Sequence, residues 1–285
     1  MTSRHVPRDP AKRRASTYDV PMSSPVAAFF DLDKTIIAKS STLAFSREFQ
    51  AGGLISRGAL LRSAYAQFMF AVGGADHDQM EKLRSFLSEL VTGWDVATVS
   101  DIVRDTLTNI VEPLVYDEAV QLIAQHHDAG HEVVIVSASG QEVVGPIGEL
   151  LGADHVIATR LEIVDGRYTG LIDYYAYAEE KARAVREMAD ERGYDLAECF
   201  AYSDSVTDVP MLEVVGHPYA VNPDKELRKA AQAHEWEILQ FSRPVALRTT
   251  LAPPARQTLT ALAVGGALAA GGVIWANARR RRPGA

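Results

Sequence analysis

Short runs of apolar residues recur along the chain and predict buried strands. The first run occupies residues 26–30, between Pro25 and two carboxylates, and contains no polar residue. A run without polar alternation is typical of a strand buried on both faces, as in a parallel sheet. Further strands are predicted at residues 131–136, 155–158, 199–202 and, as the last core strand, 219–223. Asp165-Gly166, between apolar residues 161–164 and residues 167–170, predicts a hairpin.

Residues 40–112 instead repeat apolar residues at three- and four-residue spacings, which is the pattern of amphipathic helices. Helix breakers and capping residues divide this segment into consecutive predicted helices. The first predicted helix runs from Thr42 to Gly52-Gly53, and the second runs from Leu54 to Gly73-Gly74. The third follows Asp76, and the fourth follows Asp95. Beyond Pro113, helices are predicted near residues 116–129, 142–150, 178–193 and 210–215.

The alternation of strands and helices after Pro113 makes the predicted fold class α/β. We predict a Rossmann-like parallel-sheet core made of residues 25–39 and 113–250. An all-helical cap at residues 40–112 is expected to be inserted after the first strand. Two terminal segments, residues 1–24 and 251–285, lie outside this core.

Charge is unevenly distributed along the chain, and this excludes one class of partner. The net charge is −8, but residues 1–24 carry five basic and two acidic side chains, and residues 251–285 carry five arginines and no acid. Residues 25–250 are left with 19 basic and 35 acidic side chains, a net charge of −16. A nucleic-acid-binding protein needs a basic face, and this middle section has no obvious one. No nucleic-acid partner is therefore expected.

The N-terminal segment and the cysteine content indicate the cellular compartment of the chain. Residues 1–24 are basic, proline-containing and poor in apolar residues, which predicts a disordered tail; contact of this tail with acidic lipid or a partner is the alternative. No apolar signal-peptide core precedes the first strand. The single cysteine, Cys199, fits a reducing compartment. The core, residues 25–250, is therefore expected in the cytoplasm.

The C-terminal segment is hydrophobic and ends in arginines. Residues 258–278 are 21 residues without a charge, and residues 279–282 are all arginine. As a helix, this segment would span about 31 Å, against about 30 Å for the hydrocarbon core of a bilayer. We predict a C-terminal hydrophobic helix that attaches the chain to the cell membrane. Its glycines leave an interfacial or a soluble helix as alternatives, and basic residues on both flanks leave the orientation open.

Two carboxylates follow the first predicted strand. Asp31 and Asp33 are two positions apart, so both side chains can face one pocket at the end of that strand. Two such charges are costly together unless a cation or a shared proton intervenes, and a hard divalent cation held by oxygens is the favoured interpretation. The alternative is a strand end followed by an acidic helix cap.

Other strand ends carry further polar residues. Ser137 follows the strand at 131–136, and Asp204 and Asp208 follow the strand at 199–202. Ligands of open α/β sheets bind beyond the carboxyl ends of the strands, so these side chains are expected to meet Asp31 and Asp33.

Single polar residues have simpler explanations when they are considered alone. A serine before a helix, such as Ser137, is usually an N-cap. Lys181 falls on the first turn of a predicted helix, where the helix dipole disfavours a cation, and from this residue alone a solvated lysine is favoured. The histidines show no metal-ligand spacing, and His126-His127 is placed at the polar end of a helix.

Taken together, the motifs resemble those of a known family. Residues 31–35 (DLDKT), Ser137 in 137–140 (SASG), Lys181, and residues 204–208 (DSVTD) follow in the order of the haloacid dehalogenase superfamily. The resemblance covers roughly residues 25–245 and is to subfamily IB, the phosphoserine-phosphatase-like branch with a helical cap. Within this branch, the chain resembles the actinobacterial members with a C-terminal hydrophobic segment.

The resemblance implies a role for each motif residue. Asp31 would attack phosphorus and form an aspartyl-phosphate, and Asp33 would act as general acid and then as general base. Lys181 would neutralise the nucleophile and the phosphate, which reverses its interpretation as a solvated residue. The implied phosphate-binding residues are Thr35, Ser137, Ala138 and Lys181.

The resemblance also implies a Mg²⁺ ion. Asp31, Asp204 and the backbone carbonyl of Asp33 would hold the ion, with phosphate and water completing its shell. Asp208 would either bind the metal as well or hold the residues that bind it. The ion would bring the nucleophile and the phosphate together.

The implied activity is hydrolysis of a small phosphomonoester, but the substrate stays open. Phosphoserine phosphatases of this type carry a glutamate nine residues beyond the nucleophile, and this chain has Ser40 there; Thr207 replaces a common asparagine. Loss of that carboxylate would forfeit a charge-assisted hydrogen bond worth about 1.5–3 kcal/mol. We therefore expect a general magnesium-dependent phosphomonoesterase, with phosphoserine as one candidate substrate. A membrane-tethered phosphatase of lipid-derived phosphate esters and an inactive phosphate-binding module are the alternatives. The oligomeric state is not predicted.

Overall fold

The fold is built around the strand β1 (Ala27–Phe30), whose residues are all completely buried. Its side chains alternate between the two faces of the sheet, because successive residues of a strand point in opposite directions. Phe30 packs with Val133 and Ile123 on one face, and Phe29 packs with Val185 on the other. The prediction of a strand buried on both faces is confirmed.

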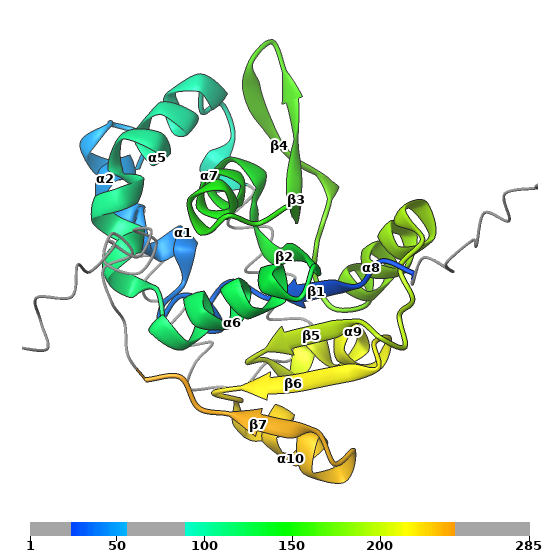
Figure 1. Cartoon of the computed structure of the whole chain (residues 1–285). Coiled ribbons are helices and arrows are strands. Elements are labelled where there is room, and N and C mark those ends of the chain that lie inside the picture. Colours follow the sequence, from blue (N-terminus) through cyan, green and yellow to red (C-terminus); the bar gives the residue numbers. More distant parts are fainter. Residues whose placement is uncertain (1–23, 56–88, 243–285) are drawn as a thin grey trace, which may run out of the picture.

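The computed structural model describes residues 24–55 and 89–242. In this part of the chain, strands form a seven-stranded sheet in the order β4-β3-β2-β1-β5-β6-β7, drawn in Figure 1. All pairs are parallel except the β3–β4 hairpin. The strands that join β1 are β2 (Glu132–Gly140), β3 (His155–Val164), β4 (Arg167–Tyr174), β5 (Phe200–Ser203), β6 (His217–Val221) and β7 (Glu237–Leu239).

Helices cover both faces of this sheet (Figure 1). One face packs against α6 (Asp117–Asp128) and α7 (Gln141–Leu151), and α5 (Val96–Val111) packs against α7. The other packs against α8 (Glu179–Arg192), α9 (Val209–Glu213) and α10 (Lys225–Ala233). The shorter helices are α1 (Ser41–Ala44), α2 (Ser46–Ala51), η1 (Glu112–Leu114) and η2 (Val206–Asp208). The predicted α/β fold with a mostly parallel sheet is thus confirmed.

Three details of the predicted strands are wrong. The segments 155–158 and 161–164 form one continuous strand, β3, because the chain turns only at Asp165-Gly166, where both residues have positive φ. Strand β2 runs on to Gly140 instead of ending at residue 136. Residues 219–223 do not form the last strand, since β7 pairs in parallel with β6 after the unpredicted helix α10.

The prediction that His126 lies at the polar end of a helix is also wrong. Its side chain is buried, and its Nε2 lies 2.9 Å from the hydroxyl of Tyr202, while its Nδ1 lies 2.9 Å from Nδ1 of His131. The ring packs at an angle against Phe30 and Phe200. His126 is therefore a core residue.

Several predicted segments lie wholly or partly outside the described residues. They include the N-terminal tail, the two middle cap helices after Leu54 and Asp76, and the C-terminal hydrophobic helix at 258–278. Of the predicted cap helices, the first is present as α1 and α2, and the one after Asp95 is present as α5, with Asp95 accepting from the backbone N–H of Thr98. Within residues 24–55 and 89–242, no helix is long and apolar enough to cross a membrane.

Candidate active site

Asp31 stands directly at the carboxyl end of β1. Its backbone N–H donates to the carbonyl of Tyr202 over 2.9 Å, which extends the pairing of β1 with β5 by one residue. Its side chain is buried and accepts from Lys181 Nζ over 2.7 Å at Oδ1 and from Thr35 Oγ1 over 3.3 Å at Oδ2. The sheet and these two donors fix the orientation of this carboxylate.

Lys181 is a buried residue, so the interpretation as a solvated lysine is wrong. Its side chain lies on the first turn of α8, is 3% exposed and donates to both Asp31 and Asp208, the latter over 2.8 Å at Oδ2. Ser203 Oγ donates to the same oxygen of Asp208 over 2.7 Å. The electrostatic attraction of two carboxylates outweighs the unfavourable helix dipole at this end of α8. Asp208 is thus oriented toward Lys181.

The pKa values of these groups reflect a crowded, water-poor site. Burial raises the pKa of Asp31 to about 8 against the opposing effect of Lys181, and the carboxylates of Asp208, Asp204 and Asp33 raise it further. Burial likewise raises the pKa of Asp204 to about 7. Burial opposes the charge of Lys181, but Asp208 and Asp31 reverse this effect and raise its pKa. The lysine therefore remains charged, but its single positive charge does not neutralise all of the carboxylates around it.

Asp33 lies beside Asp31 but has separate partners. Its Oδ1 accepts from the backbone N–H of Ser41 over 2.7 Å, and its Oδ2 accepts from Ser139 Oγ over 3.1 Å. Burial raises the pKa of Asp33, and hydrogen bonds from the two serines oppose that rise. A carboxyl group with a raised pKa, held in one orientation, suits proton transfer.

The end of β2 brings a small polar surface to the same edge of the sheet. Ser137 is buried, and its Oγ accepts from the backbone N–H of Ser139 over 3.2 Å. Because Ser137 Oγ uses a lone pair for this bond, its hydroxyl proton can still be donated to an anion. The carbonyl of Ala138 accepts from Thr159 Oγ1 over 2.7 Å, which anchors the turn.

The acidic residues at this edge fit a magnesium ion better than a closed metal cage. Among the described residues, no three His, Cys, Asp or Glu side chains are grouped as metal ligands. Mg²⁺ usually takes only one or two carboxylates and completes its shell with water and substrate phosphate. Asp31 and Asp204 supply such a pair, and burial raises the pKa of both, so that a bound cation would favour their charged forms. The exposed ammonium of Lys34 lies 3.8 Å from Asp204 Oδ2.

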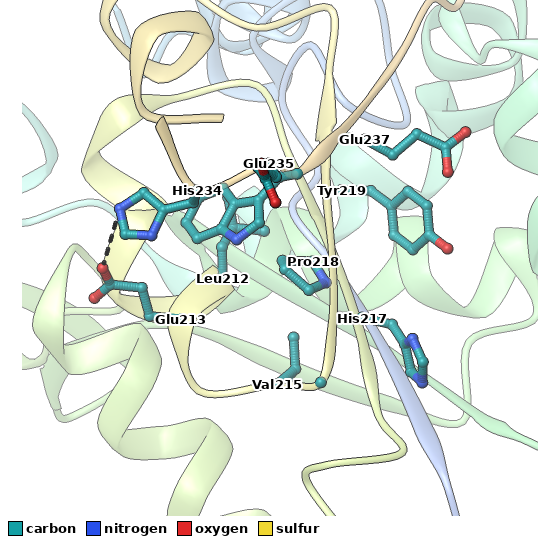
Figure 2. A pocket seen from close by; sticks show the side chains of 11 residues that line it. Leu212, Glu213, Val215, His217, Pro218, Tyr219, His234, Glu235 and Glu237 are labelled. Carbon is teal, nitrogen blue, oxygen red and sulfur yellow. Dashed lines mark ion pairs between the residues drawn. The ribbon is translucent and has the colours of Figure 1, made fainter. Parts of the chain in front are cut away.

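A cavity of the described chain lies elsewhere and does not contain this chemistry. It measures about 460 Å³ and is lined by residues from the amino ends of β6 and β7, among them His217, Trp236 and Glu237 (Figure 2). Figure 2 also shows His234 paired with Glu213 at its side, over 3.8 Å. The predicted site residues lie at the carboxyl ends of the strands, which is the opposite edge of the sheet. We assign function to that edge because, within residues 24–55 and 89–242, a buried lysine and several carboxylates meet there.

Sequence reasoning placed most of this site but missed two residues. Ser41 and Ser139 are the partners of Asp33, and neither was singled out. For Ser139 a signal existed, since it lies two positions beyond Ser137 at the same strand end. Ser41 offered none, because its approach to Asp33 depends on the turn after β1.

Comparison with known proteins identifies the family of this chain. A family model described as haloacid dehalogenase-like hydrolase matches residues 28–213. The chain belongs to this family. A Mycobacterium tuberculosis protein named as a probable phosphatase is 58% identical over 256 residues, which are 89% of each chain. Another protein of that organism, named as a phosphoserine phosphatase, is 34% identical over 98% of this chain and 89% of its own.

The haloacid dehalogenase-like fold is also found in solved structures. A substrate-bound phosphoserine phosphatase matches with a TM-score of 0.57 at 21% identity, over 81% of this chain and 98% of that one. This likeness concerns the fold. Together with the family match and the named relatives, it makes the chain an enzyme of the haloacid dehalogenase type, a hydrolase with phosphatase homologues.

Proposed function

We propose that the chain is a magnesium-dependent phosphomonoesterase that works through an aspartyl-phosphate on Asp31. One observation carries this proposal: the buried carboxylate of Asp31 lies 2.7 Å from the Lys181 ammonium, while Asp33, two residues on, is bound by other donors. The two carboxylates are thus held in different environments. Such a difference separates a nucleophile from an acid–base group.

In the first step, an oxygen of Asp31 attacks the phosphorus of the ester. A bond forms between this oxygen and phosphorus as the bond from phosphorus to the alcohol oxygen breaks. Asp33 gives its proton to the alcohol oxygen, so that a neutral alcohol leaves. Lys181 and the hydroxyl of Ser137 bind the phosphoryl oxygens, whose charge Lys181 offsets.

In the second step, water replaces the alcohol. Asp33, now a carboxylate, takes a proton from the water as its oxygen bonds to phosphorus. The bond between phosphorus and Asp31 breaks, which restores the free carboxylate and releases inorganic phosphate. Asp208 does not exchange protons in this scheme, since it holds Lys181 in position.

The proposed magnesium site uses residues already at this edge of the sheet. Asp31, Asp204 and the carbonyl of Asp33 would hold the ion. When bound, Mg²⁺ neutralises charge on the phosphate and aligns it with the nucleophile. Because Asp208 Oδ2 is already engaged by Lys181 and Ser203, we propose that Asp208 supports the site from behind the ion.

The proposed substrate is a small phosphomonoester without a required ammonium group. Ser40, at the position of the glutamate that reads the amino group of phosphoserine, directly precedes α1, and its carbonyl accepts from the backbone N–H of Ala44 over 3.0 Å. A serine there gives a substrate ammonium no opposite charge. The relative named as a phosphoserine phosphatase keeps phosphoserine among the candidates to be tested.

Phosphate release by the full-length chain tests the proposal. We expect release that requires Mg²⁺, stops with a chelator and is lost in Asp31→Asn. The substrates would be glycerol phosphate, L-phosphoserine and lysophosphatidate, the last probing the predicted membrane-tethered alternative. Magnesium-independent release, or full activity of Asp31→Asn, would refute the mechanism. No release from any ester would favour the inactive phosphate-binding module.

A further inference from the structure

The carboxylate of Asp33 is held by two serines that have no assigned role in the reaction. The backbone N–H of Ser41 donates to Oδ1 over 2.7 Å, and Ser139 Oγ donates to Oδ2 over 3.1 Å. Ser41 Oγ in turn donates to Ser139 Oγ over 2.9 Å. These three hydrogen bonds close a ring. Both serines are buried, so water does not readily replace their hydrogen bonds.

The hydrogen bonds of this ring converge on Asp33. Ser139 Oγ donates to Asp33 Oδ2 and accepts from Ser41 Oγ. Both oxygens of Asp33 therefore accept from fixed donors, and the plane of the carboxylate is set. A general acid must present its proton within hydrogen-bond reach of the leaving oxygen, and a small misorientation lowers the rate strongly.

The ring also joins two elements that are distant in sequence. Ser41 begins α1, at the junction of the core with the segment predicted to form the cap, and Ser139 lies near the end of β2. The orientation of Asp33 therefore depends on contact between α1 and the end of β2.

We propose that Ser139, supported by Ser41, is a positioning residue that aims Asp33 at the oxygen of the leaving alcohol. This inference rests on the proposed phosphatase function. Ser139 acts only through Asp33: as the bond from phosphorus to the alcohol oxygen breaks, Asp33 transfers its proton to that oxygen. Loss of the Ser139 hydroxyl should therefore slow reactions that need this proton and spare those that do not.

Two substrates of similar size separate these cases. Benzyl phosphate releases an alcohol that must be protonated, whereas p-nitrophenyl phosphate releases a stable phenolate that needs no proton. The values of kcat/KM report the steps through departure of the leaving group, and a general loss of binding would lower both alike. In the full-length chain with Mg²⁺, we expect Ser139→Ala to lower kcat/KM for benzyl phosphate roughly 10- to 100-fold. For p-nitrophenyl phosphate, the expected loss is less than about threefold, since general acid catalysis is not needed.

Two further variants control for disturbance of the β2 turn. Ser139→Thr keeps the hydroxyl and is expected to restore the wild-type ratio of the two kcat/KM values. Thr159→Val removes a neighbouring buried hydroxyl, which binds the carbonyl of Ala138 and does not touch Asp33. This variant is expected to change both values by the same factor.

Failure of the positioning role and failure of the proposed function give different results. If Ser139→Ala lowers both kcat/KM values equally, or neither, the positioning role is overturned while the phosphatase function stands. The positioning role would also be overturned if the ratio of kcat/KM for benzyl phosphate to that for p-nitrophenyl phosphate were as low in Ser139→Thr as in Ser139→Ala. If the wild-type chain hydrolyses neither these two esters nor glycerol phosphate, L-phosphoserine or lysophosphatidate with Mg²⁺, the proposed function fails and the inference fails with it.

Discussion

Lys181 Nζ lies 2.7 Å from Asp31 Oδ1, although 150 positions separate the two residues in the chain. The same ammonium donates to Asp208, so one buried cation binds two buried carboxylates. Removing one partner of such a group leaves uncompensated charge in a medium of low polarity, which is far more costly than the loss of a surface ion pair. This contact connects α8 to the end of β1 and fixes the orientation of the Asp31 carboxylate.

Replacing Lys181 by methionine should therefore impair both activity and stability. We expect kcat/KM for phosphate release to fall roughly 100- to 1,000-fold, as when a charge-stabilising donor is lost from an active site. The buried carboxylates left behind should also lower the free energy of unfolding by about 3–5 kcal/mol. Steady-state kinetics and urea unfolding measure the two effects.

Arg183→Met is the matched control, because Arg183 lies on the same helix, is exposed and pairs with Glu180. Surface ion pairs contribute about 0–1 kcal/mol, so this variant should retain its activity and nearly all its stability. Activity of Lys181→Met within threefold of wild type would contradict the assigned role of Lys181.

Asp204 is expected to control the magnesium requirement. Asp204→Asn keeps the size of the side chain but removes its charge, and we expect the Mg²⁺ concentration for half-maximal rate to rise about tenfold or more. The measurement is a Mg²⁺ titration of phosphate release. Asp190→Asn, an exposed carboxylate on α8, serves as control. Equal Mg²⁺ requirements in wild type and Asp204→Asn would remove Asp204 from the metal site.

His126 should make the protein less stable in mild acid. Burial lowers the pKa of His126 to about 4, with smaller contributions from His131 and His127. Between that value and the ordinary pKa of about 6.5, the unfolded chain binds more protons than the folded chain, so stability rises with pH. The contribution is complete above pH 6.5 and is lost progressively as the pH falls toward 4.

Urea unfolding at two pH values tests this effect. From pH 7 to pH 5, the titration of His126 should lower the free energy of unfolding by about 2 kcal/mol. His126→Phe should lack this part of the decrease, although it also loses the contact with Tyr202 at both pH values. His127→Gln, on the exposed side of the same helix, should retain it. A decrease of equal size in His126→Phe would show that other groups cause it.

The sequence was most informative where short-range patterns determine the structure. The apolar run before Asp31 predicted a strand buried on both faces, and the two-residue spacing placed Asp33 beside it. Both are local consequences of strand geometry. The strand ends at Ser137 and Asp204 could be aligned with Asp31 because parallel strands present their carboxyl ends at one edge.

Contacts that depend on tertiary packing could not be read in this way. Nothing in the sequence around Lys181 indicates Asp31 as its partner, and helix preferences alone favoured a solvated side chain. Strand β7 has only three residues and no apolar run, so no periodic signal marks it. The hydrogen bond between Ser41 and Ser139 spans 98 positions and requires the turn after β1 to bring α1 against β2.

The central claim is that Asp31 is the nucleophile, and detection of the phosphorylated chain tests it most directly. The full-length protein would be incubated with a hydrolysed ester and Mg²⁺, stopped with acid and analysed by peptide mass spectrometry. We expect one phosphoryl group on the peptide that contains Asp31 in the wild type. Asp31→Asn should carry none and should release no phosphate. Phosphate release by Asp31→Asn at the wild-type rate, or a phosphoryl group on another residue, would contradict the account.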